Sequence, residues 1–589
     1  MSTRDQHHRT GAELRPMDRR RLGRRAFVQV AGGAAGGAIL AACGGGATTA
    51  PQPTTGGAAT PAVAIATSAA GSPTTAGAST PASAAGAPRK GGTLVVANTS
   101  DPEVLDPHIT TNIIAGYALT LMHDTLITRD YDGSFKPGVA EKYEISPDGK
   151  TYTFTLKKGV KFHSGKEMTA ADVKYSFDRW RTIEKAPNAY TIQPVDTIET
   201  PDPQTVRFVL KTPYNIFLDQ LAGVWAVILN KDAVDKAGKD YGVSTVDGTG
   251  PYRFVSWTRG QKLAMARHDA YTWGSPIFQN AGPTYLDGVE FRVIPEDTTR
   301  VAEFEAGNVH ILTQVPGVDA ARLGKTSGAG VVQYPQLETT YMGINTKKAP
   351  FDDLKVRQAI NYALNKDELV KGAIFGLDTP ALTMAAPATP YYAKGIEPTV
   401  PTYDPKKAAS LLDEAGWKPG SGGIREKDGK QLVMPLWVFN ETLWILLGQI
   451  IEQQLGKVGI KVDTKQYEGA AMFAALRAGD HVAYTLDFYY ETLDSVFYFY
   501  FYSKQQPAPN RFSYNVPEVD KLLEDTRTNS DKTVVAQDYE AIQKRILADL
   551  PSAPLFHATG TVGKADAVQA LKVHPSRWLY KMMDLSLKK

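Results

Sequence analysis

The residues best suited to chemistry lie together in one acidic and aromatic segment, Asp487–Tyr502. Asp487 and Glu491 supply carboxylates that can accept hydrogen bonds from an amine or from hydroxyl groups. Tyr489 can stack on a ligand or hydrogen-bond to it, and Phe488 adds a second ring. Such a set is suited to holding a small molecule. For the final part of the run, 497–502, we favour a plainer interpretation, a buried helix or strand.

Signatures of catalysis are absent from the sequence. It contains no GxSxG, no HExxH and no SxxK motif with a suitable partner, and its ten His residues are scattered. His163 has no second His, Cys or paired carboxylate at ligand spacing, so we interpret it as structural. The Gly-rich segment Val246–Phe254 matches neither the P-loop nor the dinucleotide pattern. We therefore expect no enzymatic activity, no metal and no cofactor.

The stretch Thr339–Val370 predicts a strand, a break and then a helix. It begins extended, and Pro350 requires a new element, because the residue before a proline avoids helical backbone angles. Asp352 or Asp353 can cap this new helix and favour its positive end. Apolar residues follow at helical spacing and predict one buried face: Val356, Ala359, Ile360, Ala363 and Leu364.

The elements after this stretch predict an α/β architecture. Asn365 can end the first helix, and Asp367 can open the next. Leu432–Phe439 is a predicted strand, Thr442–Leu455 a helix, and Ile460–Val462 another strand. A strand, a helix and a strand at this spacing favour a parallel βαβ unit. We expect the inward side of the helix to carry Leu443, Leu446, Leu447, Ile450 and Ile451.

The N-terminal region predicts export and lipid anchoring. Residues 1–43 contain the twin-arginine pair Arg24-Arg25, a mildly apolar run and the sequence Leu-Ala-Ala-Cys ending at Cys43. Such a cysteine becomes lipidated and forms the new N-terminus, and Cys43 is the only cysteine in the chain. Residues 44–90 are predicted to be a disordered tether rich in Gly, Ala, Thr and Pro, which would span roughly 35–40 Å. It could also be an O-glycosylated stalk.

Length and charge narrow the classes of protein. At 589 residues the chain is long enough for two to four domains. The formal charge of +3 includes +5 from residues 1–42, so the remainder carries −2 and predicts no nucleic-acid surface. No stretch after residue 43 is long and apolar enough to span a bilayer. We also expect a monomer.

Three motifs carry a resemblance to a known family. They are "FKPGVAEKYEISPDGKTYTFTLKKGVKFHSGKEMTAADVKYSFDRW" (Phe135–Trp180), "GTGPY" within the Gly-rich segment, and "MGINTKKAPFDDLKVRQAINYALNKDELV". In the first motif, Tyr152, Phe154 and Leu156 alternate as a half-buried strand, and Thr169 can cap a helix. Together the motifs resemble the extracellular solute-binding proteins of family 5, the peptide-type receptors of ABC importers. The resemblance covers nearly all of the chain from residue 92 onward.

The resemblance implies an α/β fold of the periplasmic-binding-protein type, with two lobes of type II and an extra subdomain on the first lobe. The first lobe would combine 91–136, 247–338 and 557–589, with 137–246 as the appended subdomain. The opposing lobe would be 339–556. The chain would cross between lobes near Thr339 and Phe556, and these crossings would make a hinge.

The resemblance also implies a ligand cleft between the lobes. It places Tyr341 at the crossing, and Asp487, Phe488, Tyr489 and Glu491 on the opposing lobe. The loop after the first strand would border the cleft with Asp106 and His108, although it could equally be a solvated connection.

The acidic and aromatic segment departs from the family pattern. Relatives that bind peptides usually have a Trp and an Asp here, and the Asp takes the α-ammonium of the ligand. This sequence has no Trp in the segment and places Tyr489 or Tyr490 where the Asp is expected, although Asp487 or Glu491 could substitute. We therefore expect an extracytoplasmic, lipid-anchored receptor that delivers a peptide-like solute to ABC permease subunits. An oligosaccharide or other neutral solute is the alternative, and a secreted hydrolase is a weaker one.

Overall fold

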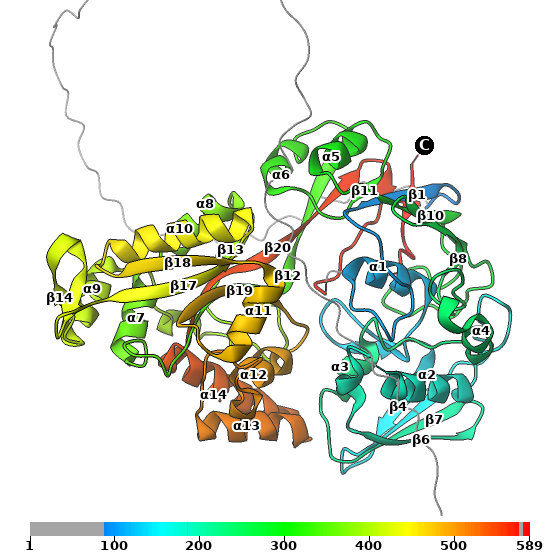
Figure 1. The fold of residues 1–589 in the computed structure, drawn as a ribbon. Coiled ribbons are helices and arrows are strands. Elements are labelled where there is room, and N and C mark those ends of the chain that lie inside the picture. Colours follow the sequence, from blue (N-terminus) through cyan, green and yellow to red (C-terminus); the bar gives the residue numbers. More distant parts are fainter. Residues whose placement is uncertain (1–87, 185, 577–580, 589) are drawn as a thin grey trace, which may run out of the picture. The chain divides into compact units, whose positions relative to one another are not determined.

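The computed structural model describes residues 88–184, 186–576 and 581–588. The predicted signal, Cys43 and nearly all of the predicted tether lie outside the described residues. The described residues form one compact unit, in which the chain builds an α/β structure around a large mixed sheet (Figure 1).

The large sheet has eleven strands in the order β18-β17-β19-β12-β20-β11-β1-β10-β9-β8, with β13 also paired to β20. The strands are β1 (Thr93–Asn98), β8 (Tyr252–Thr258), β9 (Lys262–Arg267), β10 (Gly288–Val293), β11 (Ile311–Leu312), β12 (Ala329–Ile344), β13 (Thr379–Pro380), β17 (Val433–Phe439), β18 (Lys461–Tyr467), β19 (Ala483–Tyr489) and β20 (Ser552–Ala565). We call the β11-to-β8 side its first half and the β19-to-β18 side its second half.

The two longest strands, β12 and β20, connect these halves and are here called the crossing strands (Figure 1). Near one end, β20 pairs with β11 through Ile311 and Lys564. Near the other, β12 pairs with β19 from Glu338 to Ile344. The pairing between the crossing strands shifts register between Pro335 and Thr339, and again after Thr340. The ladder is therefore irregular where the chain passes from one half to the other.

A separate four-stranded antiparallel sheet precedes β8 in the chain and is here called the subdomain sheet. Tyr152, Phe154 and Leu156 are buried on alternate positions, as predicted. The predicted cap of the following helix is confirmed, because the Thr169 backbone N–H donates to the Asp172 carboxylate at 3.0 Å. The sheet comprises β4 (Ala140–Ile145), β5 (Thr151–Leu156), β6 (Val195–Asp202) and β7 (Thr205–Leu210), with α2 (Ala170–Thr182), α3 (Phe217–Ala222) and α4 (Lys231–Ala237) nearby in the chain.

The predicted strand, break and helix after residue 339 is confirmed, with one correction. Asp353 caps α7 (Leu354–Ala363) by accepting from the Lys355 N–H at 2.8 Å. Asn365 does not end that helix; its side chain caps the next one, α8 (Lys366–Ile374), by accepting from the Glu368 N–H at 3.1 Å. The short amide side chain satisfies an unpaired N–H at the helix start, where such residues are most stabilising.

The predicted parallel βαβ unit is also confirmed, because β17 and β18 pair in parallel and α10 (Thr442–Gly456) connects them. The buried face of α10 is rotated from the predicted one. Trp444, Leu447 and Ile451 are buried, whereas Leu443 and Ile450 are half-buried. The Trp444 ring packs edge-on against Phe439 at 5.5 Å, and this large contact sets which side faces the sheet.

The remaining elements complete both halves. The helices are α1 (Ile113–Met122), α5 (Asp297–Glu305), α6 (Gly317–Leu323), α7 (Leu354–Ala363), α8 (Lys366–Ile374), α9 (Pro405–Glu414), α10 (Thr442–Gly456), α11 (Gly469–Ala478), α12 (Leu493–Phe501), α13 (Pro517–Thr528) and α14 (Lys532–Asp549). The short strands are β2 (Ile127–Arg129), β3 (Phe135–Pro137), β14 (Lys418–Pro419), β15 (Arg425–Lys427), β16 (Lys430–Gln431), β21 (Val568–Gln569) and β22 (Ser586–Leu587).

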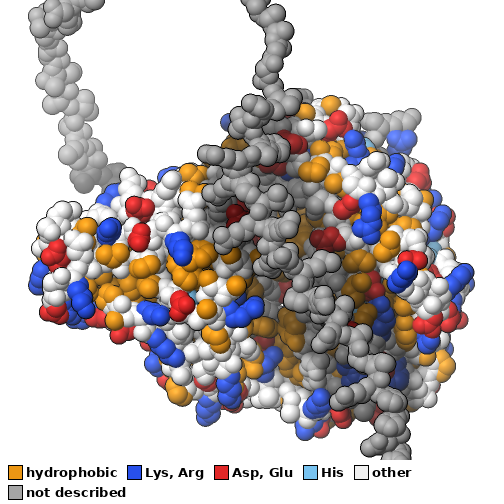
Figure 2. All heavy atoms as spheres, viewed as in Figure 1, with side chains coloured by type: hydrophobic (Ala, Val, Ile, Leu, Met, Phe, Trp, Pro, Cys, Tyr) orange, Lys and Arg blue, Asp and Glu red, His pale blue; other side chains and the backbone are white. Residues whose placement is uncertain are grey.

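The surface carries both signs of charge. On the face drawn in Figure 2, acidic and basic side chains are interspersed. Among the described residues, no helix combines the length and the apolar character that crossing a membrane requires.

Candidate functional site

A cavity of about 250 Å³ lies where the segment joining β19 to α12 faces the subdomain. We call it the aromatic cavity, because rings from both sides line it. Its aromatic lining consists of Trp180, Tyr190, Trp225, Phe488, Tyr489, Tyr490 and Phe499, and its polar lining includes Asn188, Thr191, Asp219, Gln220, Glu491, Thr492 and Ser495. Rings with a few polar groups between them are typical of small-molecule sites.

Strand β19 and the cap of α12 position one wall of the aromatic cavity. In the antiparallel pairing with β12, Phe488 lies opposite Thr339. The Phe488 ring stacks on Tyr490 at 5.9 Å and meets the Tyr500 ring at 4.4 Å. Thr492 then caps α12 by accepting from the Ser495 N–H at 3.2 Å. The Tyr490 and Tyr500 rings pack against Phe488 and so hold its ring in place.

A charged cluster lies at the edge of the aromatic cavity. The buried Arg129 guanidinium is 2.7 Å from the Asp219 carboxylate and 3.9 Å from that of Glu491. The Tyr489 hydroxyl lies 3.0 Å from Glu491 and 3.1 Å from the Ser576 carbonyl, either of which can accept its proton. Because a buried guanidinium requires anionic partners, Arg129 draws carboxylates from both sides of the cavity together.

Asp106 and His108 lie behind the opposite wall. Arg179 forms a bidentate ion pair with Asp106, at 3.0 and 2.5 Å, and its Nη1 donates to His108 Nδ1 at 2.8 Å. Burial, together with Arg179, holds the pKa of His108 well below its usual range, so the imidazole stays neutral and can accept this bond. The His108 ring stacks on Trp180 at 5.7 Å. Neither residue lines the aromatic cavity; His108 supports the Trp180 indole that does, and Asp106 fixes the Arg179 side chain that bonds to His108.

Tyr341 and Asp487 also lie outside the aromatic cavity. Tyr341 is fully buried in the core of the second half, where its ring meets Tyr484 and Tyr500 edge-on. Asp487 is exposed, although the protein around its carboxylate raises its pKa by partial desolvation. Of the residues predicted for the site, the aromatic cavity therefore brings together Phe488, Tyr489 and Glu491.

Most of the other lining residues were not predicted, among them Trp180, Tyr190, Trp225 and Asp219. Tyr190 follows Pro187 and Asn188, and Trp225 follows Gly223. A large ring beside turn-forming residues is the signal that could have identified Tyr190, whereas Trp225 lies within an apolar run and looks like a core residue. Asp219 carries no such signal, since it looks like an ordinary acid in the first turn of α3.

A larger cavity of about 810 Å³ adjoins the aromatic cavity, since Asp219 and Thr492 line both. Its lining is mixed, with Arg129 and Lys532 among the cations and Tyr152, Tyr391 and Tyr539 among the rings. The two cavities together offer more room than a single amino acid occupies, since pockets of 300–1,000 Å³ typically enclose drug-sized molecules.

A polar contact next to the larger cavity joins the subdomain to α13. The backbone N–H of Asn215 donates to the Arg527 carbonyl at 2.9 Å. Its side-chain amide donates to the carbonyls of Thr526, at 2.9 Å, and Asn529. The Arg527 guanidinium stacks on the Tyr498 ring at 3.7 Å. Asn215 thus satisfies carbonyls at the end of a helix, which otherwise lack partners.

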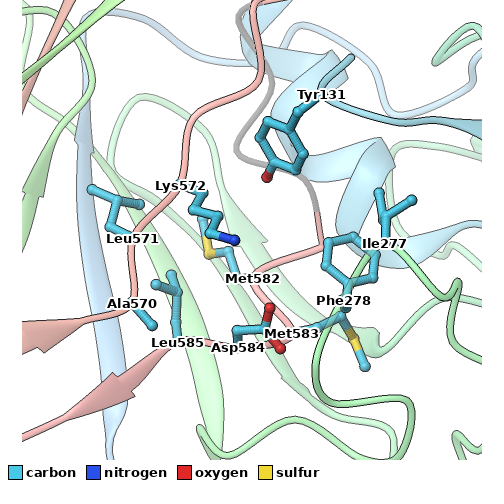
Figure 3. Close-up of a pocket in the computed structure, with 10 residues that line it drawn as sticks. All are labelled: Tyr131, Ile277, Phe278, Ala570, Leu571, Lys572, Met582, Met583, Asp584 and Leu585. Carbon is cyan, nitrogen blue, oxygen red and sulfur yellow. The ribbon is translucent and has the colours of Figure 1, made fainter. Parts of the chain in front are cut away.

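The pocket drawn in Figure 3 is too small to be the main site. It lies between Tyr131, Phe278, Lys572 and Asp584 and holds only about 20 Å³, which is room for about one water. No cluster of three or more His, Cys, Asp or Glu residues that could hold a metal occurs in the described part of the chain.

Comparisons with known proteins agree with this architecture. Residues 134–510, more than half of the chain, match the family described as bacterial extracellular solute-binding proteins, family 5 Middle. The oligopeptide-binding protein AppA of Bacillus subtilis is 29% identical over 84% of this chain and 92% of its own length. The glutathione-binding protein GsiB of Pectobacterium atrosepticum is 31% identical over 78% of this chain and 87% of its own.

A solved structure extends the likeness to three dimensions. The structure of Bacillus subtilis AppA in complex with a nonapeptide superposes with a TM-score of 0.68 and 28% identity, covering 85% of this chain and all of that one. This confirms the predicted two-lobe α/β fold of type II. The sequence match, the shared fold and the ring-lined cavity lead to one conclusion: the chain belongs to the bacterial extracellular solute-binding proteins of family 5.

Proposed function

We propose that this protein is the substrate-binding component of an ABC importer, and that it captures a peptide-like solute outside the cytoplasm. Lipid attached at Cys43 would anchor it, and residues 44–90 would tether the folded body to the membrane. The permease subunits of the importer would receive the solute. The names of AppA and GsiB, an oligopeptide-binding and a glutathione-binding protein, favour a peptide over an oligosaccharide.

The observation that carries this proposal is the aromatic cavity with its charged edge. Trp180, Tyr190 and Trp225 supply apolar area on one side, and Tyr489 and Glu491 supply a ring and a carboxylate on the other. Rings provide contact area and the few polar groups fix orientation, as a receptor requires. The adjoining larger cavity gives room for a ligand of several residues.

Capture would use the two-lobe arrangement. The first lobe would comprise 91–136, 247–338 and 557–589, with 137–246 appended, and the opposing lobe 339–556. A solute that touches both walls of the aromatic cavity stabilises the closed state only, and this shifts the equilibrium toward closure. The crossing strands would serve as the hinge.

The decisive experiment is mass spectrometry of the small molecules that copurify with the full chain carrying Cys43→Ala, a change that removes the anchor. We expect a peptide-like solute. Adding it back at 100 times its dissociation constant should raise the free energy of unfolding by about 2.7 kcal/mol without turnover. Hydrolysis of the added solute, or the absence of stabilisation by any copurified molecule, would contradict the proposal.

A further inference from the structure

Tyr490 belongs both to the wall of the aromatic cavity and to a buried chain of hydrogen bonds. Its ring lines the cavity and stacks on Phe488. Its hydroxyl accepts from the Ala386 backbone N–H at 2.5 Å and lies 3.0 Å from the Thr339 hydroxyl. The side chain is only 2% exposed, so these partners replace water for the phenol.

The chain of hydrogen bonds continues to the crossing strands. The Thr339 hydroxyl lies 3.0 Å from His557 Nδ1, and the two residues face each other in the pairing of β12 with β20. His557 also faces Thr379 of β13. The regular pairing between the crossing strands is interrupted just before Thr339. Side-chain hydrogen bonds therefore link the strands where the backbone ladder is least regular.

One end of this chain of hydrogen bonds has a fixed direction. The Ala386 N–H can only donate, so Tyr490 accepts there and keeps its own proton available for Thr339. Burial lowers the pKa of His557 to about 3, which keeps its imidazole neutral. With the ring proton on Nε2, Nδ1 accepts from Thr339; with the proton on Nδ1, it donates to Thr339. In either tautomer the Thr339 hydroxyl links Tyr490 to His557, and linked bonds of this kind reinforce one another.

We propose that Tyr490 is a positioning residue that couples occupancy of the aromatic cavity to the geometry of the crossing strands. The inference rests on the proposed function, in which two lobes close about these strands. A solute that packs against the ring holds the phenol toward Thr339, and the bond from Thr339 to His557 then holds β12 against β20. In the other direction, a hinge movement that separates Thr339 from His557 loosens the wall.

The plainer alternative is that the three residues only stabilise the core. Such a role would change the thermal stability of a variant but leave the ratio of open to closed molecules untouched. A coupling role changes that ratio, and removing either hydroxyl breaks the same chain. The two changes should then not add.

The experiment uses the full chain with Cys43→Ser, so that introduced cysteines are the only thiols. Dyes at Lys236→Cys and Glu452→Cys, both exposed and on either side of the aromatic cavity, report the separation of the lobes by single-molecule energy transfer. The distribution of dye separations is recorded for the protein alone and for the protein with a tryptic digest of casein as a peptide probe. Wild-type side chains should give two separations whose ratio the probe changes.

Tyr490→Phe keeps the ring and removes the hydroxyl, and Thr339→Val keeps the shape and removes the hydroxyl. Each should change the ratio of open to closed molecules by about two- to tenfold, the range for one net hydrogen bond. The double variant should change it no further, and Thr339→Ser should restore it. The matched control is Thr485→Val on β19, whose buried hydroxyl has no hydrogen-bond partner among the described residues.

Two results would overturn the inference. In the first, Tyr490→Phe and Thr339→Val give the same ratio of open to closed molecules as Thr485→Val, while the parent chain still shows two separations. The coupling is then wrong and the proposed function stands. In the second, the parent chain shows a single dye separation both alone and with the peptide probe. Lobe closure is then refuted, and the coupling is refuted with it. If Thr339→Val does not fold, the comparison of the open-to-closed ratios of Tyr490→Phe and Thr485→Val decides the question.

Discussion

Replacing Glu491 by Gln tests whether the captured solute carries a positive charge. Glu491 is the acid of the acidic and aromatic segment that lines the aromatic cavity, and its carboxylate is about one-quarter exposed. Arg129 lies 3.9 Å away but is closer to Asp219, so Glu491 keeps most of its capacity to accept from a ligand. The substitution retains size and one acceptor oxygen, removes the charge and replaces the other oxygen by an NH2 donor.

The expected loss depends on the ligand. A hydrogen bond to a charged group contributes about 1.5–3 kcal/mol, so losing it against an ammonium should weaken binding by about 10- to 150-fold. For a neutral solute the change should stay near 0.5–1 kcal/mol, or about two- to fivefold. In that case Tyr489→Ala should be the severe substitution, because it removes a ring from the wall.

Asp487→Asn provides the matched control, since it makes the same chemical change four residues away and outside both cavities. Titration calorimetry with the copurified solute gives each dissociation constant. Quenching of Trp180 and Trp225, which line the aromatic cavity, gives a second measurement. An Asp487→Asn protein that loses as much affinity as Glu491→Gln would refute the assignment of the site to this cavity. So would full affinity in all three variants.

Three further predictions concern closure, acid stability and anchoring. Asn215→Ala removes two side-chain hydrogen bonds to the end of α13 and should increase the open population by about 5- to 100-fold, as measured by small-angle scattering or energy transfer. Between pH 7 and 5, buried imidazoles whose pKa is lowered, His108 among them, must bind protons on unfolding, so the free energy of unfolding falls with the pH. Asp378 and Asp494, whose pKa burial raises to about 6, act oppositely. Urea unfolding should show a net loss of roughly 5 kcal/mol or more, and unchanged stability would contradict this prediction. The imidazoles with pKa lowered to about 3 or 4 are His123, His163, His557 and His574. Cys43→Ala should release the protein from membranes in a fractionation experiment, and a protein that stays bound would exclude this anchor.

Local patterns predicted most of the secondary structure because they report local physics. The alternation around Phe154 and the cap at Thr169 depend on neighbouring residues only, and both are as predicted. The face of α10 was misjudged because Trp444 packs on Phe439, a contact that helical periodicity does not contain. Asn365 was assigned to the wrong helix because Asn is favourable at either end, and only the Glu368 N–H decides between them.

One wall of the candidate site could be predicted and the other could not. Phe488, Tyr489 and Glu491 are neighbours in the chain, and their types together with the family resemblance of their segment suggested a ligand surface. Trp225 lies far away in sequence and reaches the same cavity only through the fold. Asp219 gains its role from Arg129, which the sequence gives no reason to place beside it.

The residues that lie behind the walls of the aromatic cavity would let the proposed site bind with little reorganisation of its side chains. Arg179 is fixed by two bonds to Asp106 and one to His108, and the His108 ring in turn supports the Trp180 indole. On the other side, Tyr490 is fixed by Thr339. Ordering a loose side chain on binding costs about 0.5–1.5 kcal/mol. Because these rings are already ordered, binding would not include that cost. In the proposed site, such polar residues would contribute to recognition by holding rings, which is a different role from touching the solute.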